Sequence, residues 1–185
     1  RCFFLMIRRT PRSTLFPYTT LFRSDYFSAW RAMETAYQEG KLKAIGVSNF
    51  YPNILTNFCE IVKVKPVVNQ VELHPYYTQE KALETMKYYN VVPEAWAPLG
   101  GGRYNPFEDE MLKRIAAKYN KSVGQVILRW NIQRGVIVIP KSTHVERIKE
   151  NIDIFDFELN EEEMKQDRKS TRLNSSHLGI SYAVF

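Results

Sequence analysis

Four short apolar segments, each separated from the next by a stretch with helical periodicity, dominate the middle of the sequence. They lie within residues 44–47, 65–75, 91–100 and 136–140. Strands that are joined through a helix pair in parallel, with right-handed crossovers. The segments are apolar runs rather than alternations of apolar and polar residues, which predicts strands with both faces covered. The sequence therefore predicts an α/β fold built on a parallel sheet.

The segments between the strands have the features of amphipathic helices. In YFSAWRAMETAYQEG, apolar residues recur at three- and four-residue spacing, and Gly40 suits the left-handed position after a helix. A second helix is expected from Pro52, and a third between Thr78, as its cap, and Asn90. The other helices are expected over residues 105–120, from Ser122 with Gln125 at capping-box spacing, and after Thr143 with Glu146 at the same spacing.

Two architectures fit this alternation: an open, doubly wound sheet, and part of an eight-stranded barrel with helices outside. An open sheet would usually bind a dinucleotide through a glycine-rich first turn, and the sequence contains no G-x-G-x-x-G. Three stretches follow apolar runs at the expected carboxyl ends of strands: Ser48 with Asn49, Trp96 to Gly100, and Lys141 with Ser142. Barrels of this kind keep their active sites at the carboxyl ends of their strands. The barrel is therefore the favoured architecture.

The two ends of the chain differ from the middle in charge and pattern. The chain has a formal charge of +6, but residues 25–166 hold 18 basic and 19 acidic residues, whereas the ends hold 8 basic residues and one acidic residue. Residues 1–24 and 167–185 resemble translated sequencing-adapter DNA, so we expect neither to be a domain and both to make few contacts. The alternative is a basic arm that binds nucleic acid, although its basic residues are scattered and no RNA-binding motif accompanies them. The apolar run before Arg8 is too short for a membrane span.

The motifs GVSNF, NQVELHPY, AWAPLG and IPKS followed by RIKEN, in this order and spacing, resemble the second half of an aldo-keto reductase. The resemblance covers Asp25 to about Gln166. It implies the second half of a (β/α)8 TIM barrel, with about four parallel strands and alternating helices, and therefore an incomplete barrel. It also implies that residues 25–166 form an NADP-binding domain, because the family binds NADPH in an extended conformation without a Rossmann motif.

The resemblance implies four residues at the nicotinamide end of the cofactor. Ser48, Asn49 and Gln70 would hydrogen-bond the carboxamide, a group that needs both donors and acceptors. Trp96 would stack on the nicotinamide ring. The alternative for the three polar residues is strand-end capping, and the alternative for Trp96 is a position in the core.

The implied pyrophosphate contacts are Leu99, Gly100 and Gly101, where the absence of glycine side chains permits a close approach. A glycine run by itself is often no more than a flexible loop, and that alternative stays open here.

The resemblance places the adenosine end of NADP(H) at the start of the last helix. Lys141, Ser142 and Arg147 would bind the 2′-phosphate, the group that separates NADPH from NADH, while Glu150 and Asn151 would contact the adenine. The planar fork of an arginine suits a phosphate because it makes paired, charge-assisted bonds. The alternative is a solvated helix face on which Arg147 pairs with an acidic neighbour.

No residue of this chain is named as catalytic. In the resembling family an Asp, a Tyr, a Lys and a His from the first four strands act on the carbonyl, with the Tyr as proton donor, and this chain begins after them. His74 is expected to be a structural strand-end residue, His144 lies at a helix start and His177 lies in adapter-like sequence. Cys2 and Cys59 imply neither a disulfide nor a metal site and fit a reduced, cytoplasmic setting.

The sequence thus predicts an NADPH-dependent oxidoreductase that reduces aldehydes and ketones to alcohols, here as a fragment that lacks the catalytic tetrad. The full-length parent is expected to be an enzyme, whereas no activity is assigned to the fragment. Two alternatives stay open: a non-catalytic NADPH-sensing regulatory subunit on the same fold, and a truncated product without function. The expected partner of the parent is a small-molecule carbonyl substrate, with no nucleic acid and no membrane, and the parent is expected to be a monomer.

Overall fold

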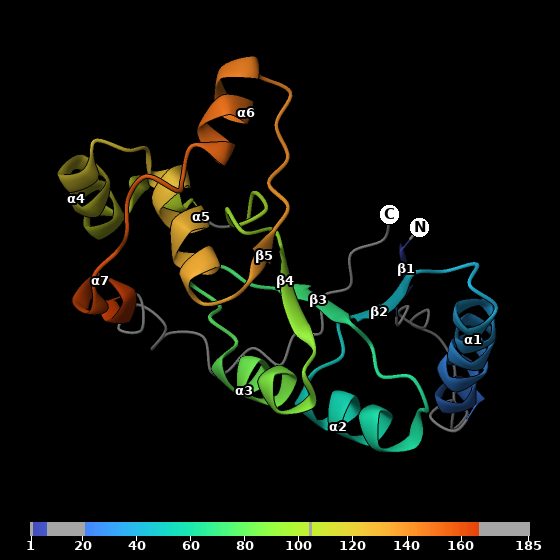
Figure 1. The fold of residues 1–185 in the computed structure, drawn as a ribbon. Coiled ribbons are helices and arrows are strands. Elements are labelled where there is room, and N and C mark those ends of the chain that lie inside the picture. The colour runs from blue at the N-terminus through green and yellow to red at the C-terminus, as the bar shows by residue number, and fades with distance from the viewer. Residues whose placement is uncertain (1, 7–20, 104, 167–185) are drawn as a thin grey trace, which may run out of the picture. The chain divides into compact units, whose positions relative to one another are not determined.

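A computed structural model describes residues 2–6, 21–103 and 105–166 of the 185-residue chain. Strands alternate with helices in this part (Figure 1). The strands that pair with one another run parallel. In chain order the elements are β1 Cys2–Met6, α1 Leu21–Gln38, β2 Ala44–Ser48, α2 Pro52–Ile61, β3 Val68–Glu72, α3 Glu80–Tyr89, β4 Val92–Trp96, the 3-10 helix η1 Pro106–Glu108, α4 Glu110–Tyr119, α5 Val123–Gln133, β5 Ile137–Val138, α6 Val145–Ile152 and α7 Glu161–Gln166. The α/β fold that the sequence predicts is confirmed. In the described residues, no helix is long and apolar enough to cross a membrane.

The described residues fall into two compact units. The first holds residues up to 70 together with Lys81–Val92, and the second holds Val71–Glu80 and residues 93–166.

In the first unit β2 is the central strand. It pairs with β1, where Cys2 lies opposite Ala44, and with β3, where Ser48 lies opposite Gln70. The pairing of β1 was not expected, because residues 1–24 were excluded from the fold. That expectation is wrong for Cys2–Met6, since a short run of strand-forming residues can add to an open sheet edge through its backbone alone. Residues 7–20 and 167–185 lie outside the described part.

The core of the first unit is an aromatic cluster around Phe58 of α2. The ring of Phe58 is fully buried, and its centroid lies 4.9 Å from that of Phe50 and 5.0 Å from that of Trp30, both at steep, edge-on angles. The Phe27 ring stacks on it at 5.4 Å. Trp30 also donates its indole N–H to the carbonyl of Val64 at 3.0 Å. Such edge-on pairs are favoured by the ring quadrupoles, so the helical stripes of α1 and α2 meet here as their periodicity predicts.

In the second unit β4 pairs with β5, with Ala95 opposite Val138. Helix α5 is its most buried helix, and it begins with the expected capping box: the Ser122 hydroxyl accepts the Gln125 backbone N–H, and the Gln125 side chain accepts the Ser122 backbone N–H. Asp109 caps α4 by accepting two backbone N–H groups. Both caps satisfy donors that a helix leaves unpaired at its first turn.

Several expected boundaries are wrong. Helix α3 begins at Glu80, directly after Gln79, so Thr78 is not its cap; the carbonyl of Thr78 instead accepts a hydrogen bond from Arg134. Helix α6 begins at Val145, with His144 rather than Thr143 at the cap position, and no side chain caps it. The strand expected over residues 136–139 is only two residues long, and α7 was not expected.

Candidate functional site

In the first unit, three of the predicted polar residues lie together at the carboxyl ends of β2 and β3. The Ser48 hydroxyl donates to the carbonyl oxygen of Gln70 at 3.0 Å, and the backbone N–H of Asn49 donates to the same oxygen at 2.8 Å. Ser48 and Asn49 are both buried. The Ser48 hydroxyl therefore caps the end of β3, as the alternative of strand-end capping expects. Its hydrogen bond to Gln70 also fixes the position of the Ser48 oxygen.

The turn after β2 is held in shape by a residue for which the sequence suggested no role. Asn49 has a φ of 60°, in the left-handed region, and the following Phe50 is fully buried. The Asn69 side chain, itself 0% exposed, accepts the Phe50 backbone N–H and donates to the Phe50 carbonyl at 2.7 Å. The available signal was a polar residue inside an otherwise apolar run, because a buried amide must find partners. Asn69 thus supports the turn that carries Asn49.

In the second unit, Trp96 ends β4 and is half-buried, so it does not occupy the core position that was its alternative. The guanidinium of Arg103 lies over the indole ring, 5.9 Å from its centroid. Arg103 also approaches the buried carboxylate of Glu72, with 3.6 Å between Nη1 and Oε2. His74, fully buried, lies 3.5 Å from the other oxygen of Glu72, in keeping with the expected strand-end position.

The loop after Trp96 is a tight turn whose shape requires glycine. Gly100 and Gly101 have φ angles of 87° and 56°, and the Gly100 N–H donates to the Ala97 carbonyl at 2.9 Å. A Cβ atom on Gly101 would lie 2.9 Å from the Cβ of Ala97, closer than such atoms approach. Gly100 is buried and Gly101 is exposed, so the loop exposes its backbone at Gly101, where a side chain would not fit.

A cavity of about 810 Å³ in the second unit brings together six of the predicted residues. They come from the loop after β4, from the segment after β5 and from α6: Leu99, Lys141, Ser142, Arg147, Glu150 and Asn151. The other lining residues are Phe107, Ser122, Gly124, Thr143 and His144. The opening turn of α6 therefore borders a space large enough for a small molecule.

The side chains that line this cavity carry a net positive charge. Lys141 and Arg147 supply two cations and Glu150 one anion. Within the described ranges neither cation forms an ion pair, and Glu146, the acid next to Arg147 in sequence, instead approaches Lys149 at 3.8 Å. Among the residues that the structure describes, Arg147 therefore has no acidic partner, in contrast to the alternative of a neutralised helix face. Unpaired cations beside the start of a helix favour a bound anion.

The segment that follows α6 is fixed by Lys121, whose side chain is nearly buried. Its ammonium lies 2.8 Å from the Asp153 carboxylate and 2.7 Å from that of Asp156, and the Gln125 side chain donates to the Asp153 carbonyl at 2.7 Å. Hydrogen bonds from Lys121 lower the pKa of Asp156 below its usual value of 3.8. The bonds to Asp153 and Asp156 in turn raise the pKa of Lys121 above its usual 10.5.

These shifts predict how the pair contributes to stability as the pH changes. The lowered pKa of Asp156 gives a contribution that is present above its unfolded value, near 4, and is lost as the pH falls through the lower folded value. The urea midpoint of the wild type should therefore exceed that of Asp156→Asn at pH 7, and the difference should shrink as the pH falls below about 4. The effect should be small, because the Asp156 side chain is largely exposed. A difference that persists unchanged at low pH would contradict this role of the ion pair.

Metal-binding and thiol chemistry have little support in the described part of the chain. No group of three or more His, Cys, Asp or Glu side chains there could hold a metal ion. Cys59 is buried and free, and burial raises the pKa of its thiol to about 11, against a smaller opposing effect of Lys65. At neutral pH the thiol is therefore protonated and a weak nucleophile.

Comparisons with known proteins agree on one family. The model of the Aldo/keto reductase family matches residues 10–171. The chain is 46% identical over 145 residues to the 9,11-endoperoxide prostaglandin H2 reductase of Trypanosoma cruzi, covering 78% of this chain and 51% of that protein. It is 49% identical over 142 residues to the glyoxal reductase of Bacillus subtilis, covering 77% and 51%. The chain thus spans about half the length of these curated relatives.

Solved structures show the same likeness. An aldo/keto reductase of Brucella melitensis superposes with a TM-score of 0.73 at 46% identity, covering 79% of this chain and 56% of that one. An aldo-keto reductase of the silkworm Bombyx mori, solved in complex with NADP, has a TM-score of 0.74 at 38% identity, covering 78% and 50%. These neighbours are (β/α)8 barrels, so the sequence was right to favour the barrel over the open sheet.

Proposed function

Because the chain belongs to the aldo/keto reductase family, we propose that it is the NADP(H)-binding half of an oxidoreductase that reduces aldehydes and ketones to alcohols. The observation that carries this proposal is the cavity of about 810 Å³ that gathers six of the predicted residues, two of them cations that form no ion pair within the described part of the chain. Members of the family act on small carbonyl substrates. We expect the parent protein to do so as a cytoplasmic monomer.

The 2′-phosphate of the adenosine is the group that best suits the charged end of this cavity. Arg147 offers a planar fork for paired bonds to phosphate oxygens, and Lys141 adds a second positive charge. The Ser142 hydroxyl accepts the N–H of His144 at 3.1 Å and donates to the carbonyl of the same residue at 3.4 Å; rotation of the hydroxyl would turn its proton to a phosphate oxygen instead. Glu150 and Asn151, on the same helix, would contact the adenine, whose ring edge offers both donors and acceptors.

The loop after β4 suits the pyrophosphate. Leu99 borders the cavity, Gly100 follows it in the turn, and Gly101 presents exposed backbone where no Cβ would fit. A chain of phosphates can therefore approach this backbone closely.

At the nicotinamide end, Trp96 would stack on the ring in the second unit, with Arg103 over its indole. In the first unit, Ser48, Asn49 and Gln70 are gathered at two strand ends and would hydrogen-bond the carboxamide. When bound, the cofactor supplies the hydride. The residues of this chain bind it and fix which face of its ring is presented, and we assign none of them a role in proton transfer.

The experiment that tests the proposal is a comparison of NADP⁺ and NAD⁺ binding to the purified 185-residue chain by isothermal titration calorimetry. We expect NADP⁺ to bind measurably more tightly, because only NADP⁺ carries the phosphate that the two cations would meet. Adenosine 2′,5′-bisphosphate should compete with NADP⁺, whereas adenosine 5′-monophosphate should compete weakly. Equal affinities for the two dinucleotides would remove the basis of the proposal.

A further inference from the structure

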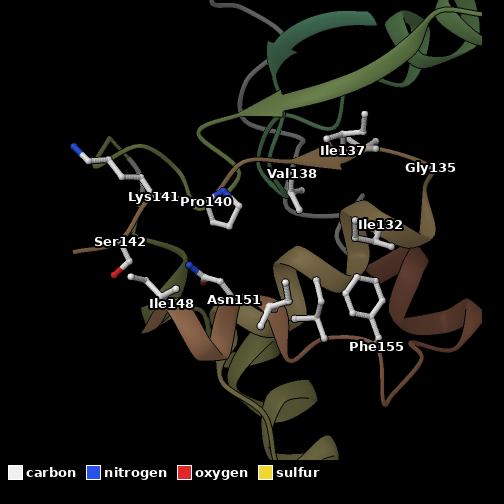
Figure 2. A pocket seen from close by; sticks show the side chains of 13 residues that line it. Ile132, Gly135, Ile137, Val138, Pro140, Lys141, Ser142, Ile148, Asn151 and Phe155 are labelled. Carbon is white, nitrogen blue, oxygen red and sulfur yellow. The ribbon is translucent and has the colours of Figure 1, made fainter. Parts of the chain in front are cut away.

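The second unit holds a second cavity, of about 650 Å³. Figure 2 shows β5 with Val138 on one side of it, and α6 with Ile148 and the segment that carries Phe155 on the other. Most of its lining is aliphatic or aromatic, and we call it the apolar cavity. A lining of this kind fits many small molecules equally well, so we assign the apolar cavity no ligand.

Elsewhere in the second unit, Trp96 carries a cation on one face of its indole ring. The guanidinium carbon of Arg103 lies over the ring, 5.9 Å from its centroid, within the range in which a cation is attracted to an indole face. Trp96 itself is half-buried at the end of β4. Because Arg103 takes one face of the indole, a nicotinamide ring that stacks on Trp96 would take the other.

Contacts from the end of β3 fix this arrangement. The buried carboxylate of Glu72 lies with Oε2 3.6 Å from Nη1 of Arg103, and its Oε1 lies 3.5 Å from Nε2 of His74. The Leu73 backbone N–H donates to the Trp96 carbonyl at 3.4 Å, which joins the two strand ends. The guanidinium is therefore held near the indole, although the Arg103 side chain is 47% exposed.

The two redox forms of the cofactor differ in charge at the ring that would meet Trp96. The oxidised nicotinamide ring of NADP⁺ carries a positive charge, whereas the reduced ring of NADPH is neutral. A ring stacked about 3.5 Å from the indole would lie roughly 9 Å from the guanidinium, close enough for two cations to repel each other. Arg103 also draws the π electrons of the indole toward itself, which weakens the attraction of the other face for a second cation.

We propose that Arg103 makes the Trp96 site prefer NADPH over NADP⁺, because only NADP⁺ brings a second cation to the indole. The inference rests on the proposed function, since it requires the nicotinamide to stack on Trp96. The preference gives the site a direction: NADP⁺ that remains after a carbonyl has been reduced would leave more readily, and NADPH would take its place. Glu72 offsets part of the Arg103 charge, so we expect a modest preference rather than the exclusion of NADP⁺.

The test is to measure the affinities of the purified 185-residue chain for NADP⁺ and NADPH by isothermal titration calorimetry. The variant Arg103→Met removes the charge and keeps a side chain of similar length. In this variant the dissociation constant of NADP⁺ divided by that of NADPH should fall about 2- to 5-fold. Coulomb's law gives this range for unit charges roughly 9 Å apart at an effective dielectric constant of about 40 to 80.

Two further variants separate the charge of Arg103 from other effects. Arg103→Lys keeps the positive charge and should keep the ratio of the two dissociation constants. Arg114→Met removes an exposed arginine of α4 that lines neither the apolar cavity nor the cation-lined cavity of about 810 Å³. It should leave the ratio unchanged.

A second readout is the charge-transfer absorption that an indole gives with a stacked, oxidised nicotinamide. With NADP⁺ bound, this band should move to longer wavelength in Arg103→Met, because an indole without a cation on its other face is a better electron donor. A change in the shape of the loop alone would weaken the band rather than shift it in this direction.

An unchanged ratio in Arg103→Met, or an equal fall in Arg114→Met, would overturn the role of Arg103 and leave the proposed function intact. A ratio that falls as far in Arg103→Lys as in Arg103→Met would also overturn it, because the charge would then not be the cause. If neither dinucleotide bound the wild-type chain, the proposed function itself would fail, and the role of Arg103 with it.

Discussion

Replacing Phe58 by alanine is expected to lower the free energy of unfolding by about 3–5 kcal/mol, the usual cost of deleting a buried aromatic side chain. The ring is fully buried and meets the rings of Phe27, Trp30 and Phe50. Its removal loses both the transfer free energy and the contacts across the cavity that remains. Because small domains are stable by only about 5–15 kcal/mol, a loss of this size should leave the first unit marginal.

The measurement is urea unfolding followed by tryptophan fluorescence, since Trp30 lies against Phe58. Phe58→Leu is the matched control, because it keeps most of the apolar volume and should cost clearly less. Tyr88→Ala, on a side chain that is mostly exposed, should have little effect. If Phe58→Ala and Tyr88→Ala were equally mild, the aromatic cluster would not be the core of this unit. The cluster also matters to the candidate site, because Phe50 directly follows Asn49.

Replacing Arg147 by alanine is expected to weaken NADP⁺ binding about 10- to 150-fold and to leave NAD⁺ binding nearly unchanged. The range corresponds to the loss of a hydrogen bond to a charged group, about 1.5–3 kcal/mol. Only NADP⁺ carries the 2′-phosphate, and within the described part Arg147 has no ion pair that its removal would disturb. The effect should therefore appear as lost cofactor selectivity rather than lost stability.

The matched control for Arg147→Ala is Lys149→Ala, which removes an exposed cation from the same helix without touching the cavity lining. It should change NADP⁺ affinity little, because the Lys149 charge would act on the bound phosphate only from a distance. Added salt screens such an interaction between exposed charges. Both variants are compared by calorimetry with both dinucleotides. Equal losses for NADP⁺ and NAD⁺ in Arg147→Ala would assign Arg147 a structural role instead.

The alternation of strands and helices could be predicted from the sequence because each signal is local. The apolar runs, the left-handed Gly40 and the capping box of Ser122 and Gln125 each depend on residues close together in the chain. The expected cap of α6 was wrong for a related reason. Thr143 and Glu146 had the right spacing, but α6 begins one residue later, with His144 at the cap position. Sequence spacing does not fix a helix boundary to within one residue.

Other features depend on contacts between distant residues, which periodicity does not encode. The role of Asn69 follows from its two bonds to Phe50, 19 residues away. Helix α7 is short, and its Glu163 is bonded by Lys118 and Tyr119 of α4, so tertiary contacts rather than local preference stabilise it. The residues around the cation-lined cavity could be named from motifs, but that they share one cavity could not be predicted without the structure.

Helix α6 borders both cavities, since Lys141, Ser142 and Asn151 line the cation-lined cavity and the apolar one alike. A helix of eight residues with no buried side chain is marginal by itself, so the first molecule that binds against α6 bears the entropic cost of ordering it. A molecule in the other cavity would then bind to a helix that is already ordered. Thermodynamic linkage makes this reciprocal: the factor by which occupancy of the apolar cavity strengthens the proposed NADP(H) binding equals the factor by which NADP(H) would strengthen binding in the apolar cavity. The affinity for the cofactor would thus report on whether the apolar cavity is filled.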